Sequence, residues 1–147
     1  MKAYVVEKEA LSHNIELLQK MANGVPIWAV LKGNGYGIGV LPLARHLAEA
    51  GIDHFCVTEV REAELLRENG FDTAQILMLR SVENAEEINR LIDLRAILTV
   101  GSPQMAALGN EIAAQRADVA EVHVKIDTGM GRYGFLPEDV EGILRLY

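Results

Sequence analysis

The sequence has little cysteine, no long apolar run and no excess of positive charge. Cys56 is the single cysteine in 147 residues, so no internal disulfide can form and a reducing compartment is expected. No segment approaches the ~18 consecutive apolar residues of a membrane span, and the first residues lack the apolar core of a signal peptide. We therefore expect a soluble, cytoplasmic protein.

Charge and histidine content exclude two further classes of protein. The chain has 21 acidic and 14 basic residues and a net charge of −7, which argues against nucleic-acid or anionic-membrane partners. The four histidines show no metal-ligand spacing, so no metal site is predicted. Cys56 lies in an apolar run, residues 54–57, and we expect a buried structural thiol there rather than a nucleophile.

Apolar residues recur with helical and strand periods along the whole chain. Strands are predicted at residues 26–31, 54–57, 75–79, 96–100 and 121–126. Helices are predicted at residues 8–22, 41–50, 58–70, 84–92 and 103–116, with a further helix from Pro137. The run 26–31 shows no alternation and predicts a strand buried on both faces. Thr58 is expected to cap its helix without a capping box, because Arg61 stands where Glu or Gln is needed.

Counting from Ile27, the pattern contains about five strand-plus-helix units and predicts an α/β fold with parallel strands. An open doubly wound sheet and part of an eight-stranded TIM-type barrel both fit this pattern. A closed barrel needs ~250 residues, so 147 residues can form only an incomplete TIM-type barrel. No linker separates a second domain. Residues 1–147 are therefore expected to be one domain, truncated from a larger barrel.

Lys32 ends the first apolar run and is followed by four glycines within seven residues. Glycine backbone can adopt positive φ and approach a phosphate or a flat ring closely. A lysine amine that loses solvation becomes a nucleophile, and a Schiff base with pyridoxal phosphate is a recurring outcome. Lys32 is therefore a candidate for holding a carbonyl cofactor covalently. The alternative is a strand-end lysine that points into solvent.

A second glycine-punctuated segment begins in the last predicted strand and carries Lys125 and Arg132. Ligands bind at the carboxyl ends of parallel strands in α/β folds, so Lys32, Lys125 and Arg132 are expected to meet at one mouth. The rigid donor fork of Arg132 suits a carboxylate or a phenolate oxygen. The alternative is that Asp127 and Arg132 form a loop salt bridge and that the glycines only make turns.

The two segments together resemble bacterial alanine racemases. Residues 29–37 read AVLKGNGYG and residues 125–135 read KIDTGMGRYGF, and their order and separation are similar to the family's. The resemblance covers nearly all of the chain. It implies a fold-type III enzyme that uses pyridoxal 5'-phosphate, with a βα barrel followed by a β-rich domain, and that works as a homodimer on a small amino acid. Residues 1–147 match the barrel, and the C-terminal β domain is absent from them.

The resemblance also implies roles for four residues. Lys32 matches the family's Schiff-base lysine, which is also the base on one face of the substrate, and Tyr36 matches a tyrosine that contacts the cofactor's phosphate. Lys125 matches a lysine that is often carbamylated. Arg132 matches an arginine that contacts the cofactor's phenolic oxygen and the substrate carboxylate. Racemisation needs a second base on the opposite face, which the family takes from a tyrosine of the partner subunit's C-terminal domain, so the chain alone is expected to be inactive.

Three departures from the family pattern bear on the reaction. Gly33 and Gly35 stand where alanine is common and are expected to loosen the loop, and Ile38 replaces a frequent histidine. Interconversion of L- and D-alanine is the expected reaction. Other fold-type III enzymes acting on serine or a basic amino acid, a non-catalytic binder of pyridoxal phosphate and an inert barrel fragment are the alternatives. Strands removed from a closed barrel leave unpaired edges, so self-association is expected.

Overall fold

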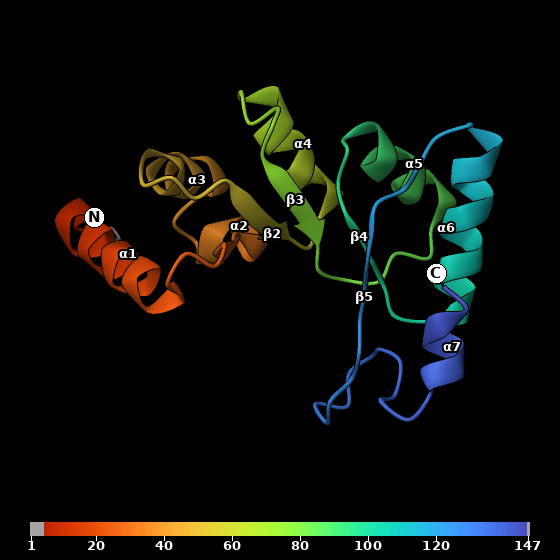
Figure 1. Ribbon diagram of the computed structural model, residues 1–147. Helices are drawn as coiled ribbons and strands as arrows, with labels where there is room; N and C mark the ends of the chain where they lie inside the picture. The colour runs from red at the N-terminus through yellow and green to blue at the C-terminus, as the bar shows by residue number, and fades with distance from the viewer. Residues whose placement is uncertain (1–4, 147) are drawn as a thin grey trace. The chain divides into compact units, whose positions relative to one another are not determined.

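The computed structural model describes residues 5–146, and these residues form seven helices and five strands (Figure 1). The chain divides into two compact units, Met1–Ile76 and Leu77–Tyr147, and each is described by itself. Strand β3 (Gln75–Met78) contains the boundary between them. Within residues 5–146, no helix combines the length and the apolar character needed to cross a membrane.

The first unit consists of parallel strands connected by helices. Its elements are α1 (Lys8–Ala22), β1 (Trp28–Val30), α2 (Lys32–Tyr36), α3 (Val40–Glu49), β2 (His54–Val57), α4 (Val60–Glu68) and the start of β3. Strand β1 pairs in parallel with β2, with Trp28 opposite His54, and the strand order is β1-β2-β3. The buried apolar side chains include Leu31, Val40, Ala44, Phe55, Val57, Ala63 and Leu66.

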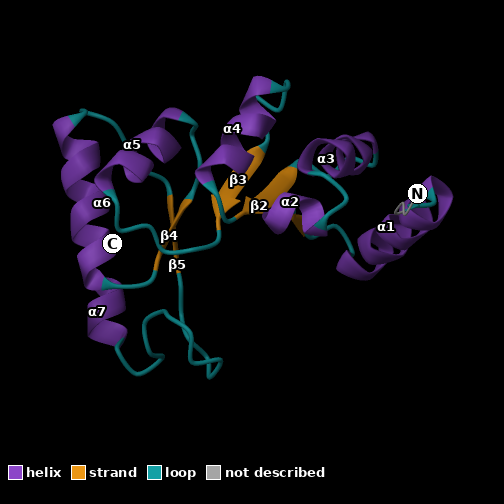
Figure 2. Ribbon diagram, turned by 180° about the vertical axis from the view of Figure 1, so that it is seen from behind, coloured by secondary structure: helices purple, strands orange, loops and turns teal. Residues whose placement is uncertain are grey.

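The second unit repeats the same pattern. After the end of β3 it contains α5 (Ala85–Asp93), β4 (Leu98–Val100), α6 (Pro103–Gln115), β5 (Val122–Val124) and α7 (Val140–Leu144). Strand β4 pairs in parallel with β5, with Leu98 opposite Val122, and α5 and α6 pack against each other (Figures 1 and 2). The buried apolar side chains include Ile88, Leu91, Ile97, Leu98, Met105, Ile112 and Phe135.

The predicted succession of parallel βα units is confirmed. Each of the five strands is followed by a helix, and the pairings of β1 with β2 and of β4 with β5 are parallel. Helix α1 and strand β2 have the predicted bounds. The Ser102 side chain caps α6 by accepting a hydrogen bond from the N–H of Met105. The Asn84 side chain caps α5 in the same way by accepting from the N–H of Glu87. Side-chain capping therefore starts these two helices at the predicted places.

Two local expectations are wrong. Helix α4 begins one residue later than expected, so Glu59 rather than Thr58 is the N-cap, and Glu62 completes a capping box at the third helical position. Strand β1 is not buried on both faces, because Val30 is 37% exposed. β1 is the first strand in the order β1-β2-β3, so among the described residues only β2 pairs with it, which leaves part of the strand uncovered.

Candidate functional site

Lys32 lies directly beyond β1, where the strand pairing holds the preceding backbone. Leu31 is fully buried and donates its N–H to the carbonyl oxygen of Cys56 at 2.8 Å. The expected burial of Cys56 is confirmed, and it raises the pKa of the thiol to about 11. Cys56 therefore stays protonated at neutral pH and supports the strand beneath Lys32.

The segment Lys32–Tyr36, labelled α2 in Figure 1 and called the Lys32 turn below, is a left-handed turn by its dihedral angles. The four residues after Lys32 have φ angles of 61° at Gly33, 56° at Asn34, 60° at Gly35 and 54° at Tyr36. Residues with a Cβ are strained in this conformation, whereas glycine is not. Gly33 and Gly35 thus relieve strain in a defined turn, which corrects the expectation that they loosen a flexible loop.

Asn34 closes the turn onto the following helix. Its carbonyl oxygen accepts the N–H groups of Gly37 at 3.1 Å and Gly39 at 2.9 Å. Its side-chain Oδ1 accepts the N–H of Val40, the first residue of α3, at 3.3 Å. Asn34 tolerates positive φ better than most residues with a side chain. The polar groups of Asn34 therefore hold the backbone between the turn and α3 in place.

Glu62 connects the Lys32 turn to helix α4, and the sequence reasoning missed it. Its Oε1 accepts the N–H of Asn34 at 3.0 Å, and its Oε2 accepts the N–H groups of Thr58 at 3.0 Å and Glu59 at 3.2 Å. The residue is only 8% exposed. In the sequence Glu62 is one of several acidic residues at the start of α4, and acidic residues there indicate only a favourable interaction with the helix dipole.

The Lys32 turn suits a phosphorylated aldehyde such as pyridoxal phosphate. Lys32 is half-buried and makes no ion pair or side-chain hydrogen bond with any residue in 5–146. A Cβ added at Gly33 would have no atom within 4 Å, so the backbone beside the amine is open, and Tyr36 is 67% exposed. The turn thus presents an accessible amine and an exposed phenolic hydroxyl within five residues.

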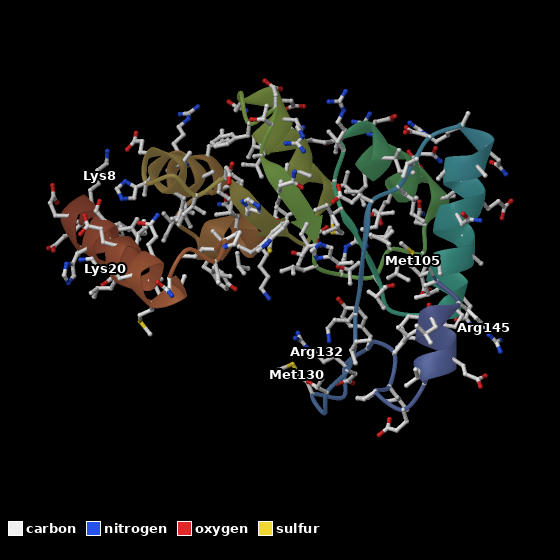
Figure 3. All side chains as sticks on the ribbon, viewed as in Figure 1. Lys8, Lys20, Met105, Met130, Arg132 and Arg145 are labelled. Carbon is white, nitrogen blue, oxygen red and sulfur yellow. The ribbon has the colours of Figure 1, made fainter. Side chains whose placement is uncertain are left out.

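The segment Asp127–Gly134, called the Arg132 loop below, is closed at its base by backbone. Asp127 donates its N–H to the carbonyl of Phe135 at 2.8 Å, and Phe135 donates to the carbonyl of Lys125 at 2.9 Å. Gly134 has φ of 127°, and a Cβ there would lie 2.9 Å from both the Asp127 nitrogen and the Lys125 oxygen. Only glycine therefore fits this closure. Figure 3 shows Arg132 and Met130 on the loop between β5 and α7.

Asp127 organises the Arg132 loop from inside. Its Oδ1 accepts the N–H groups of Gly129 and Gly131, each at 3.1 Å. The N–H of Gly131, and next that of Gly129, holds the pKa of the Asp127 carboxyl below its ordinary value. Both Asp127 and Arg132 belong to the described residues and form no ion pair with each other, so the alternative of a salt bridge between them is wrong. Arg132 is exposed.

Tyr133 anchors the Arg132 loop to the residues that directly follow β3 and β4. Its hydroxyl donates a hydrogen bond to the carbonyl of Leu79, and its ring fits against Gly101, where a Cβ would lie 2.7 Å from the ring. Burial raises the pKa of the hydroxyl. The Nζ atom of Lys125 lies 5.6 Å from the centre of the same ring and donates to the carbonyl of Ile126 at 2.9 Å. The carbamylation of Lys125 stays a prediction.

The predicted site residues fall into two pairs. Lys32 and Tyr36 belong to one turn of the first unit, and Lys125 and Arg132 belong to one strand-loop segment of the second. That the two pairs meet at one mouth stays a prediction. Each unit also has a surface hollow at the amino ends of its strands, and none of the four residues lines either hollow.

Comparison with known sequences finds alanine racemases among the relatives of this chain. The profile of the family described as "Alanine racemase, N-terminal domain" matches residues 6–147. Alanine racemase of Desulforamulus reducens is 38% identical over 142 residues, which is 96% of this chain and 38% of the relative. Alanine racemase of Staphylococcus saprophyticus is 38% identical over 130 residues, covering 88% of this chain and 34% of the relative. The chain thus spans little more than a third of the length of these curated relatives.

Comparison with solved structures agrees. Alanine racemase of Clostridium difficile 630 superposes with a TM-score of 0.80 at 35% identity, covering 91% of this chain and 36% of that one. The biosynthetic alanine racemase of Pseudomonas aeruginosa gives a TM-score of 0.80 at 29% identity, covering 92% and 37%. These likenesses confirm the predicted fold class, an α/β fold of parallel βα units that forms an incomplete TIM-type barrel.

Proposed function

The chain belongs to the family of alanine racemase N-terminal domains, and on this premise we propose that it is the lysine-bearing part of a pyridoxal-phosphate-dependent racemase that interconverts L- and D-alanine. The observation that carries the proposal is the Lys32 turn, in which an amine without an ion-pair partner among the described residues follows a buried strand end and stands beside open backbone. Such an amine is suited to covalent chemistry with a carbonyl group.

Each site residue has a task in this proposal. The bound cofactor's ring would supply the electron sink that makes the weakly acidic α-proton removable. Lys32 would hold the cofactor through Nζ and carry the proton at one face of the substrate. Tyr36 would donate its hydroxyl to the phosphate. The guanidinium of Arg132 would bind the substrate carboxylate and the phenolic oxygen, and a carbamylated Lys125 would hold Arg132 in place.

Neither Tyr133 nor Tyr36 suits the role of the second acid/base group. The Tyr133 hydroxyl already donates to the carbonyl of Leu79, and its raised pKa keeps it protonated at neutral pH, so it is not available to take a proton from the substrate. Tyr36 belongs to the same turn as Lys32 and serves the phosphate. We therefore expect the 147-residue chain, assayed alone, to bind the cofactor weakly and to leave the optical rotation of L-alanine unchanged.

Association between copies is part of the same proposal. Helix α1 exposes a row of apolar side chains, with Leu17 at 44%, Leu18 at 55% and Met21 at 80% exposure. Apolar surface of this kind favours contact with another chain. We expect the whole enzyme to be a homodimer and the chain alone to self-associate. Light scattering that shows a clean monomer at high protein concentration would contradict the second expectation.

The lysine assignment is tested by chemical trapping. The chain is incubated with pyridoxal phosphate and reduced with borohydride, and the labelled lysines are mapped. At limiting cofactor, label is expected on Lys32 ahead of the exposed Lys8 and Lys20 of α1, and the Lys32→Ala variant should lose that site only. Label spread equally over these lysines would overturn the assignment. Stoichiometric, stable labelling of Lys32 would instead contradict the expectation of weak binding.

A further inference from the structure

The carboxylate of Glu62 is buried, and its partners within residues 5–146 are all backbone amides. It is 8% exposed, and no described cation forms an ion pair with it. A buried carboxylate is costly unless hydrogen bonds satisfy it, and here three N–H groups do so: those of Asn34, Thr58 and Glu59. The burial of this side chain is therefore coupled to the geometry of all three amides.

Helix capping accounts for only one of the two carboxylate oxygens of Glu62. In a capping box the glutamate at the third helical position needs one oxygen, which accepts the N–H of the N-cap residue. The Oε2 atom of Glu62 does this for Glu59 and also accepts from Thr58. Its Oε1 instead reaches an amide 28 residues earlier, that of Asn34. Glu62 thus ties the loop after β1 to the loop after β2.

The amide that Glu62 holds lies in the middle of the Lys32 turn, two residues after Lys32. Asn34 and Tyr36 both have side chains and positive φ, so the turn is strained at these positions and needs an outside contact to keep it. If the turn relaxed, the backbone that directs the Lys32 side chain would relax with it. Small errors in the placement of a reacting group are costly, as about 1 Å can reduce a rate about 100-fold.

We propose that Glu62 is a positioning residue for Lys32, because its buried carboxylate clamps the Asn34 amide of the Lys32 turn to the start of α4. The proposal rests on the proposed function in so far as Lys32 is the residue that binds the cofactor. The hydrogen bond between Glu62 and the Asn34 amide exists in the protein without cofactor. This contact and its effect on Lys32 can therefore be measured separately.

The test compares Glu62→Gln with Glu68→Gln in the full chain. Glutamine keeps the shape, but its NH₂ group cannot accept the N–H of Asn34 while its oxygen keeps the two capping contacts. Glu68 is the matched control, since it lies on the same helix and pairs with Arg61 at its surface. Hydrogen exchange of the Asn34 amide, read by NMR without cofactor, should become about tenfold faster in Glu62→Gln and stay unchanged in Glu68→Gln. The Leu31 amide should keep its protection in both.

The second measurement is borohydride trapping of pyridoxal phosphate. The initial rate of labelling at Lys32, divided by the rate at Lys20, should fall about tenfold in Glu62→Gln. A merely structural role of Glu62 would leave this ratio unchanged. Unchanged Asn34 exchange would overturn the clamp. Faster exchange with unchanged Lys32 labelling would overturn the positioning role. Absence of Lys32 labelling in the unsubstituted chain would instead count against the proposed function. If Glu62→Gln does not fold, Glu62→Asp, one methylene too short to span both loops, should give the same pattern.

Discussion

The Lys32 turn and the Arg132 loop are both rich in glycine and both follow a parallel strand, but they are held in different ways. The Lys32 turn takes its support from elsewhere, through the carboxylate of Glu62 on α4. The Arg132 loop is closed by its own backbone and by the carboxylate of Asp127 within it. Distant substitutions should therefore disturb the first segment, whereas the second should respond mainly to changes within itself.

The largest expected effect is that of Gly134→Ala at the base of the Arg132 loop. A Cβ there meets two backbone atoms at 2.9 Å, and neither can move without opening the closure between Asp127 and Phe135. Strain and overpacking together predict a loss of about 3 kcal/mol in the free energy of unfolding, measured by urea denaturation. Gly131→Ala is the control, because φ is 70° there but no atom lies within 4 Å of the added Cβ. It should cost about 1 kcal/mol. Equal costs would show that the closure is not tight.

Gly33→Ala tests the left-handed conformation of the Lys32 turn. Since an added Cβ would touch nothing within 4 Å, the cost comes from φ of 61° alone, about 1 kcal/mol in the free energy of unfolding. Gly33→Asn should cost less, because asparagine tolerates this conformation. Denaturant midpoints of the two variants give the comparison. If alanine proves as well tolerated as asparagine, the turn is not left-handed at this position in solution.

The helices and strands were largely predictable, whereas the contacts of the site were not. The sequence pattern gives α1 and β2 their correct bounds, because Leu11, Ile15, Leu18 and Ala22 recur with the helix period and residues 54–57 form a short continuous apolar run. The start of α4 was missed by one residue, because Thr58 is a preferred N-cap residue and Glu59 is not, whereas the capping box with Glu62 places the N-cap at Glu59.

The conformation of the Lys32 turn could not be predicted from its own residues. Glycine permits positive φ without requiring it. The sign of φ at Asn34 and Tyr36 depends on the contacts of the turn with α3 and α4. The burial of Glu62 likewise depends on a partner 28 residues away. For the Arg132 loop, an arginine side chain and backbone amides are both chemically suitable partners for Asp127, and the sequence alone does not distinguish them.

Tyr133→Phe tests the anchor of the Arg132 loop to the end of β3. The substitution removes the hydroxyl that donates to the Leu79 carbonyl and leaves the ring against Gly101. One lost hydrogen bond predicts about 1 kcal/mol in the free energy of unfolding. Hydrogen exchange at Gly129 and Gly131 should rise only slightly, because Asp127 and the backbone closure remain. A large rise would mean that the loop depends on its anchor as the Lys32 turn depends on Glu62.

The smallest effect is a pH dependence confined to the Arg132 loop. The N–H groups of Gly131 and Gly129 lower the pKa of Asp127, so the folded-state value lies below the unfolded value of about 3.9. The stabilisation from this carboxylate is therefore complete above that pH and is lost as pH falls through the folded-state pKa. NMR shifts of the Gly129 and Gly131 amides should titrate only below about pH 4. In Asp127→Asn, which keeps an accepting oxygen but no charge, that titration should vanish. A midpoint at or above 4 in the unsubstituted chain would show that Asp127 does not organise the loop.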